Sequence, residues 1–156
     1  MIMNLLSLST AVVWVEFLTV SLAKYVFSGT AIKEWYSKFQ SVAILSDYLS
    51  VMIGILLGKF LFPSWPLIYS GILVQIVHDL LFYYLVLLPM PFGHNAIIDL
   101  LKKYAKQSSG WIILYDAFMI GSSVLLYESL EEVPYDKVVL ALLIGVYALT
   151  YILYTR

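Results

Sequence analysis

Cysteine is absent from this chain of 156 residues, and charged side chains make up only 12% of it. The lack of cysteine excludes disulfides, a thiol nucleophile and a cysteine-based metal site. Soluble domains carry about twice this share of charge, whereas 62% of the residues here are hydrophobic. The composition therefore indicates an integral membrane protein with little room for a soluble domain. A net charge of −1 also disfavours nucleic acid as a partner.

Proline is scarce as well, and all five prolines fall between long apolar segments. Proline cannot continue a helix, so these positions support the segment boundaries. Five segments are long enough to cross a hydrocarbon core of about 30 Å as helices. We therefore predict an all-α fold in which residues 1–156 form a single transmembrane domain, a bundle of five transmembrane helices. The predicted spans are residues 5–27, 41–62, 67–88, 111–130 and 138–154.

Two segments between the spans, residues 31–40 and 95–106, mix apolar and basic side chains. In the second of them Ile97, Leu100 and Tyr104 recur at helical spacing. This pattern is typical of short amphipathic helices that lie on a membrane surface. We predict two such helices on the inner leaflet, with an ordinary solvated loop as the alternative for each segment.

Basic residues are unevenly divided between the two ends of the predicted bundle. With the N-terminus outside, the inner side receives all of the nine Lys and Arg residues except Lys59 and Lys137. This bias predicts an N-terminus outside and a cytoplasmic C-terminus, with Trp35 and Tyr36 in the inner interfacial belt. Residues 1–9 contain no Lys or Arg, so we expect the first segment to remain as a span and not to be removed as a signal peptide.

A weak internal repeat is visible in the sequence. Residues 33–47 and 102–116 align without a gap, both beginning with Lys and both ending in Ile-Leu-x-Asp. Each unit would comprise an amphipathic helix, an outward span with its Asp about one and a half turns in, and a return span. Parallel repeats occur in transporters. Chance similarity is the alternative, because any two membrane helices share Leu and Ile.

Four of the five predicted spans contain an ionisable residue. They carry Glu16, Asp47, the pair His78–Asp79, and Asp116. A carboxylate at the bilayer centre costs roughly 2.5–3.5 kcal/mol on insertion scales, so the chain must have a reason to retain these groups. Two reasons stay open: function, which is the default for intramembrane ionisable residues, and hydrogen bonding that holds the bundle together.

Helical spacing places these residues on stripes that also carry small or polar side chains. Gln75, His78 and Asp79 share one side of their helix, and we expect the adjacent His78 and Asp79 side chains to diverge and not to pair. Such stripes should face protein, so the sequence predicts one acidic pocket that opens inward. The predicted polar cluster is Glu16, Asp47, Gln75, His78, Asp79 and Asp116, and the predicted helix-packing residues are Gly54, Gly58, Gly121 and Ser123. The last span has no charged residue in its interior and should be peripheral.

The chemistry that these residues favour is proton or cation handling. Only one histidine lies at depth and no motif with metal-ligand spacing occurs, so we expect neither a metal nor another cofactor. The serines near the aspartates have no nucleophile motif around them, so no catalytic residue is assigned and an enzyme is the less favoured class. A chain of titratable groups is sufficient for proton movement, and a His beside carboxylates fits that requirement best.

One family resemblance rests on residues 74–126, together with residues 45–59 upstream. The matching features are Gln75 with His78–Asp79, the Gly93-x-Asn95 turn, the Lys-Tyr-Ala run at 103–105, and Asp116. In these features the chain resembles small uncharacterised multispan membrane proteins encoded by large nucleocytoplasmic DNA viruses. The resemblance covers less than half of the chain and transfers no activity to any residue. It implies a viral or infected-cell membrane as the location.

These observations lead to three functional hypotheses. The first is permeation or transport of protons or cations through the acidic cluster, by a homo-oligomer because one five-helix protomer has little interior space. The second is a structural or assembly protein of a viral membrane, in the virion or in a host endomembrane, whose polar residues hold the bundle together. The third is an intramembrane enzyme that modifies lipid. Membrane lipids are the expected partners in all three, and viral capsid or membrane proteins in the second.

Overall fold

The computed structural model describes residues 3–26 and 29–155. All the regular structure in these residues is helical, which confirms the all-α prediction. Five helical segments are long and apolar enough to cross a membrane, which fits the prediction of a polytopic membrane protein. The elements are α1 (Leu5–Tyr25), α2 (Thr30–Phe39), α3 (Ser41–Leu61), α4 (Leu67–Phe82), the π-helical η1 (Tyr83–Leu87), α5 (Ala96–Ser108), α6 (Trp111–Leu130) and α7 (Tyr135–Tyr154).

The boundaries agree closely with the predicted spans, with local differences that have physical causes. Helix α7 begins at Tyr135 and not at 138, because Pro134 has the extended conformation that precedes a helix and leads directly into it. The third span ends as a π-helix, in which Leu88 N–H donates to the Tyr83 carbonyl at 2.9 Å. The predicted end of the first span, residue 27, lies outside the described residues.

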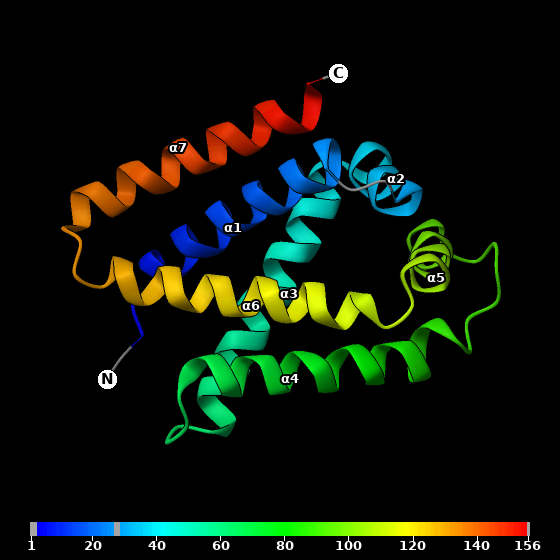
Figure 1. Ribbon diagram of the computed structural model, residues 1–156, viewed down its shortest axis with the longest axis horizontal. Helices are drawn as coiled ribbons and strands as arrows, with labels where there is room; N and C mark the ends of the chain where they lie inside the picture. Colours follow the sequence, from blue (N-terminus) through cyan, green and yellow to red (C-terminus); the bar gives the residue numbers. More distant parts are fainter. Residues whose placement is uncertain (1–2, 27–28, 156) are drawn as a thin grey trace.

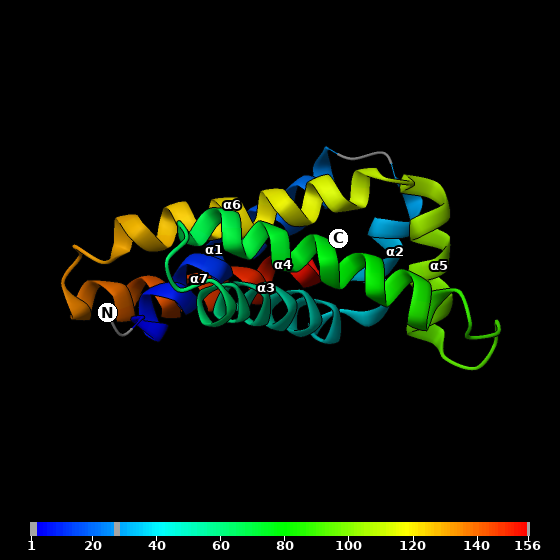
Figure 2. The same cartoon turned by 90° about the horizontal axis from the view of Figure 1, so that it is seen from below.

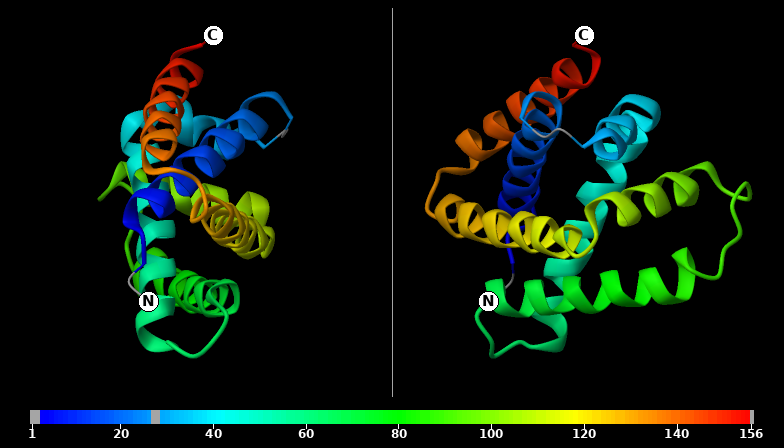
Figure 3. Two further views of the ribbon diagram at one scale, coloured as in Figure 1. Left: turned by 90° about the vertical axis from the view of Figure 1, so that its left-hand side faces the viewer. Right: turned by 45° about the vertical axis from the view of Figure 1, so that its right-hand side comes forward.

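Both short helices exist and lie at the same end of the bundle (Figures 1 and 2). Helix α5 is started by Asn95, whose side chain accepts from the N–H groups of Ile97 and Ile98. Helices α2 and α5 pack against each other, and both lie on the right-hand side of the bundle in the right view of Figure 3. The C-terminal end of α7 lies here too, since Lys24 at the end of α1 donates to the carbonyls of Ile152 and Thr155. A cation at the carboxyl end of α7 also complements its dipole.

Helix α1 is the centre of the bundle. It packs against α7 on one side and α6 on the other, α6 in turn packs against α4, and α3 crosses the row (Figure 1). Helix α7 packs chiefly against α1, which agrees with its predicted peripheral position. Because α1 lies between α6 and α7, these two sequence neighbours do not form the tightly packed hairpin that α3 and α4 form.

Small residues allow α3 and α4 to approach each other closely. A Cβ atom on Gly58 would lie 2.8 Å from the backbone nitrogen of Gly71, and one on Gly54 would lie 2.9 Å from Gln75 Oε1. Both glycines thus lie at a close contact with α4. Beside them Ile55 and Ile120 are fully buried. This packing fills the half of the bundle that lies away from α2 and α5.

The remaining predicted packing residues lie on α6. Gly121 is buried, and a Cβ atom there would come within 3.7 Å of Ile68 Cδ1 on α4, so this glycine also faces the α4–α6 interface. Ser123 is fully buried, and its Oγ has no hydrogen-bond partner among the described residues. Ser123 is thus a small packing residue and not an interhelical donor.

Backbone conformation supports the predicted repeat. Apart from Gly93, the described residues with positive φ are Gln40 at 45° and Ser109 at 50°. Left-handed backbone is uncommon for residues other than glycine. In the alignment of residues 33–47 with 102–116 these two residues occupy equivalent positions, and each joins a short helix to the following span. The two units therefore make the same unusual turn at the same place.

The contact at Gly58 predicts the effect of one added methyl group. Gly58→Ala should lower the free energy of unfolding by about 1–3 kcal/mol, because the neighbouring atoms belong to the backbone of α4 and cannot rotate away. Gly110→Ala is the matched control, since nothing lies within 4 Å of the new atom. Denaturant unfolding in detergent micelles, followed by circular dichroism, measures both. Equal stability of the two variants would contradict the packing described for α3 and α4.

Candidate functional site

The predicted polar residues meet around one large cavity. It has a volume of about 1280 Å³ and is lined by residues of α3, α4, η1 and α6, with α2 and α5 at one end. Of the predicted cluster, the cavity is lined by Asp47, Gln75, His78, Asp79 and Asp116. Polar residues from three helices, far apart in a mostly apolar sequence, thus share one space, as the stripe pattern predicted.

Helix α2 supplies hydrogen-bond donors to Asp47. Trp35 Nε1 donates to Asp47 Oδ2 at 3.1 Å and the Tyr36 hydroxyl donates to the same oxygen at 3.0 Å. Both rings are buried, with exposed fractions of 7% and 8%. The prediction of an interfacial role for this pair is therefore incomplete, because their polar atoms face a carboxylate inside the protein. Burial, followed by the negative charges of Asp47 and Glu16, raises the pKa of Tyr36 well above its ordinary value, so its hydroxyl remains a donor.

On α4 a second hydrogen-bonded group surrounds Asp79. Gln75 Nε2 donates to Asp79 Oδ1 at 2.8 Å across one helical turn. His78 Nδ1 lies 3.1 Å from the same oxygen, so the expectation that these two adjacent side chains diverge is wrong. The His78 ring also stacks on the ring of Phe82, one helical turn further along α4, with ring centroids 5.9 Å apart. Its side chain is 55% exposed, at the rim of the cavity, whereas that of Asp79 is 15% exposed.

Asp116 on α6 faces Asp79 across the cavity. The two carboxyl groups are close enough to interact directly, and Asp47 is within electrostatic reach of both Asp116 and Glu16. Tyr104 of α5 covers this group from the end of the bundle, and burial together with the charge of Asp116 raises its pKa above the ordinary value. In the repeat alignment Tyr104 corresponds to Trp35 and Asp116 to Asp47. Each unit thus places an aromatic residue of its short helix beside the Asp of its span.

Glu16 lies behind the cavity wall and is not one of the lining residues. It is fully buried in α1, and neither carboxyl oxygen has a hydrogen-bond partner within bonding distance in the described part of the chain. Its electrostatic neighbours are Tyr36, Asp47 and Asp116, three residues that do line the cavity. The sequence predicted that Glu16 lies in the pocket with the other carboxyl groups. In the structure Glu16 is near those groups but lies behind the wall, toward the centre of the bundle.

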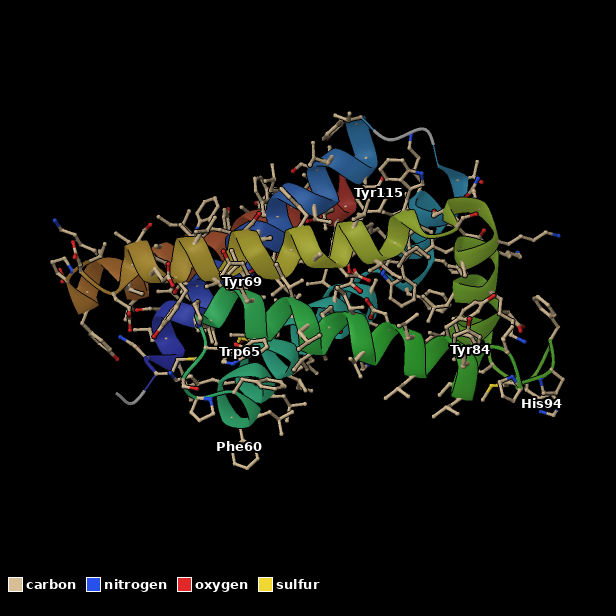
Figure 4. The ribbon with its side chains drawn as sticks, turned by 60° about the horizontal axis from the view of Figure 1, so that its bottom comes forward. Phe60, Trp65, Tyr69, Tyr84, His94 and Tyr115 are labelled. Carbon is tan, nitrogen blue, oxygen red and sulfur yellow. The ribbon has the colours of Figure 1, made fainter. Side chains whose placement is uncertain are left out.

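The site holds more acidic than basic side chains. The lining residues that can be charged near neutral pH are Asp47, Asp79, Asp116, His78 and, at one edge, Lys106. Within residues 3–26 and 29–155, no three His, Asp or Glu side chains approach one another closely enough to hold a metal ion. His94, the other histidine, lies on the loop at the far end beyond Tyr84, well away from the cluster (Figure 4). The carboxyl groups therefore share a space without forming a compact coordination site.

The cavity reaches the surface at the side of the bundle and also at the exposed turn between α5 and α6, where Lys106, Ser109 and Gly110 line it. Its rim includes exposed apolar side chains from three helices, such as Ile53 of α3, Leu80 of α4 and Phe118 of α6. Helices α2 and α5 cover one end, and the tight packing at Gly58 and Gly71 closes the other. A group with apolar substituents therefore has a path to the carboxyl residues between side chains that would face lipid.

Sequence reasoning missed the donors of α2 and the aromatic residue that α5 places at the site. Trp35, Tyr36 and Tyr104 were interpreted as membrane-surface residues, because aromatic side chains on a short amphipathic helix usually serve as interfacial anchors. The signal that could have identified them is the repeat itself, which aligns Trp35 with Tyr104 and Asp47 with Asp116.

No family model matches this chain, and comparison with curated proteins and with solved structures gives no match either.

Loss of one donor to Asp47 should be measurable as lost stability. Tyr36→Phe removes only the hydroxyl that donates to Asp47 Oδ2, and the variant should be about 1–3 kcal/mol less stable, because a hydrogen bond to a charged acceptor is among the stronger ones. Tyr147→Phe makes the same chemical change on an exposed ring of α7, whose hydroxyl donates to Tyr151. It should alter stability by less than about 0.5 kcal/mol. Chemical unfolding in the same detergent compares them, and an equal effect would argue against the role given to Tyr36.

Proposed function

We propose that the protein binds and transports protons or small cations across a membrane, using the carboxyl-lined cavity as its binding chamber. The observation that carries this proposal is the convergence of Asp47, Asp79 and Asp116 from α3, α4 and α6 on one cavity, where Lys106 is the only Lys or Arg among the described lining residues. Unbalanced negative charge in an apolar bundle attracts cations and repels anions. A chamber of this kind supports binding of a cation far better than it supports binding of an anion.

The shape of the site favours a carrier over an open pore. A carrier exposes its site to one side at a time, whereas a pore requires a continuous passage. The packing of Gly54 and Gly58 against α4 and α6 closes the outer half, while the cavity occupies the half near α2 and α5. Transport would therefore require α3 and α4 to separate at their glycine contact. An oligomer remains part of the proposal, with protomers meeting at exposed apolar helix faces.

Flux measurements on liposomes test this proposal. Purified protein should carry protons or monovalent cations into vesicles, and Asp79→Asn combined with Asp116→Asn should reduce the flux about tenfold or more, because a charge contact in a partly dehydrated site is worth more than about 1.4 kcal/mol. Asp136→Asn, an exposed aspartate in the first turn of α7, is the matched control and should leave the flux unchanged. Flux equal to that of protein-free vesicles, or full flux through the double variant, would disprove transport through this chamber.

Two other functions make different predictions for the same variants. A structural or assembly protein of a viral membrane would show no flux, and the two substitutions would lower its stability or its incorporation into virions. The hydrogen bonds from Trp35 and Tyr36 to Asp47 are the observation that favours this alternative. A lipid-modifying enzyme would instead bind lipid through the side opening and release a modified product. Of the three, transport accounts best for the oxygens of Asp79 and Glu16 that lack donors in the described residues.

The charge bias and the position of the short helices at one end of the bundle support an orientation in the membrane. We propose that α2, α5 and the C-terminus face the cytoplasm, or the equivalent face of a virion or host endomembrane. Because the chain has no cysteine, single cysteines can be introduced and labelled with an impermeant maleimide. Glu132→Cys should react in intact cells, whereas Lys38→Cys and Lys106→Cys should react only after permeabilisation. Labelling of position 132 only after permeabilisation would reverse the orientation, and opposite results for positions 38 and 106 would contradict the topology.

A further inference from the structure

We infer that the ligand of this chamber is a hydrophobic organic cation, such as a lipophilic amine or quaternary ammonium compound, and that it enters from the lipid. This inference rests on the proposed function, which it narrows to a chemical class of ligand. Four observations carry it: the size of the cavity, its aromatic lining, its unpartnered carboxyl oxygens and its apolar rim.

The cavity is much larger than a proton or a metal ion needs. Its volume is about 1280 Å³. A water molecule occupies about 30 Å³ in the liquid, and pockets for drug-sized ligands measure about 300–1,000 Å³. A proton path would require only a file of water molecules, so a cavity of this size fits an organic ligand. Such a ligand would also fill apolar space that water occupies at a free-energy cost.

Aromatic rings surround the carboxyl groups. Positively charged groups bind over aromatic faces, most strongly where water is excluded, and quaternary ammonium ligands are recognised in this way. Asp47 and Asp116 each have an aromatic residue of a short helix beside them, Trp35 and Tyr104 respectively. Carboxylates next to rings are the combination that an organic cation requires. The aromatic lining comprises Trp35, Tyr36, Phe82, Tyr83, Tyr84, Tyr104, Trp111, Tyr115 and Phe118.

Two carboxyl groups at the chamber hold acceptor atoms that no donor of the described chain satisfies. Asp79 Oδ2 is buried without a hydrogen-bond partner, and both oxygens of the fully buried Glu16 are in the same state. Asp79 lines the cavity, and Glu16 has as its electrostatic neighbours Tyr36, Asp47 and Asp116 of the cavity wall. Buried acceptors without donors are costly. A bound cation, with or without N–H groups, would neutralise these carboxyl groups.

The rim determines the route of entry and excludes one class of lipid. Ile53, Leu80 and Phe118 are exposed around the opening, so a ligand with apolar substituents can pass between them from the bilayer. Phospholipid headgroups carry a phosphate, which the three aspartates of the lining would repel. A hydrophobic cation without an anionic group can pass the apolar rim and is not repelled by the aspartates. Its apolar part would contact the rim, and its positive charge would lie near the carboxyl groups inside the cavity.

Equilibrium dialysis with a pair of hydrophobic ions of equal shape and opposite charge tests the inference. The probes are radiolabelled tetraphenylphosphonium and tetraphenylborate, and the protein is the full chain in a neutral detergent. The phosphonium should bind saturably and the borate should not. Asp116→Asn should weaken phosphonium binding tenfold or more, as expected for loss of a partly dehydrated charge contact. Asp136→Asn should leave the affinity unchanged.

The pH dependence of the unaltered protein provides a second measurement that does not depend on the folding of a variant. The probe does not titrate, so its affinity should rise with pH, because protons compete with it for the carboxyl groups. Protonation of His78 at low pH would act in the same direction. The titratable groups at or beside the chamber are Glu16, Tyr36, Asp47, His78, Asp79, Tyr83, Tyr84, Tyr104, Lys106, Tyr115 and Asp116.

The outcomes separate this inference from the proposed function. Equal binding of both ions, or phosphonium affinity that is independent of pH and of Asp116, would overturn the inference, because apolar contact alone would then explain binding. Proton or alkali-cation flux that depends on the aspartates, without phosphonium binding, would overturn the inference and leave transport in place. Charge-selective phosphonium binding without any cation flux would support the inference and refute transport.

Discussion

Burial of carboxyl groups in an apolar helix bundle is the constraint on which the rest of this structure depends. A carboxylate in hydrocarbon is unfavourable unless donors, water or a bound cation surround it. Here Asp47 receives two donors from α2, and Asp79 receives one from Gln75 and another polar contact from His78. The short helices are therefore part of the interior, since α2 brings the polar atoms of Trp35 and Tyr36 to an acid on the next span. Their position at one end of the bundle fixes where the chamber lies.

Packing in the other half of the bundle complements this arrangement. Glycines allow α3 and α4 to approach until backbone atoms meet, and Ile55 and Ile120 fill the space beside them. Close van der Waals packing of this kind is the main source of helix association in membranes. The molecule thus divides into a tightly packed half and a half that encloses the carboxyl-lined cavity.

The sequence predicted the helices well and the site in part, for reasons that particular residues make clear. The spans can be predicted because a long apolar segment ended by proline can cross a membrane only as a helix. The remaining error lies in the helix boundaries, as the start of α7 directly after Pro134 shows. The shared cavity was predictable because each acidic residue lies on a helix face that also carries small or polar residues. Gln75 and Asp79 share such a face on α4, and Asp47 and Asp116 lie on similar faces of α3 and α6. Contacts between helices could not be predicted, because residue spacing along one helix does not tell how that helix is rotated about its axis relative to its neighbours. The position of Glu16 behind the wall and the donors from α2 depend on that rotation, whereas the contact of His78 with the adjacent Asp79 depends on side-chain rotamers.

The central claim is that the carboxyl groups of α4 and α6 face each other across one cavity, and a cross-link in the cysteine-free chain tests it most directly. Asp79→Cys and Asp116→Cys would be combined in one chain and treated with a short thiol-to-thiol reagent while the protein is folded. Cyanogen bromide then cleaves after Met52, Met90 and Met119, which separates residues 53–90 from residues 91–119 unless a cross-link joins them. The account predicts joined peptides from the double variant and separate peptides from the variant that carries Asp116→Cys alone. Complete separation of the two peptides in the folded double variant would contradict it.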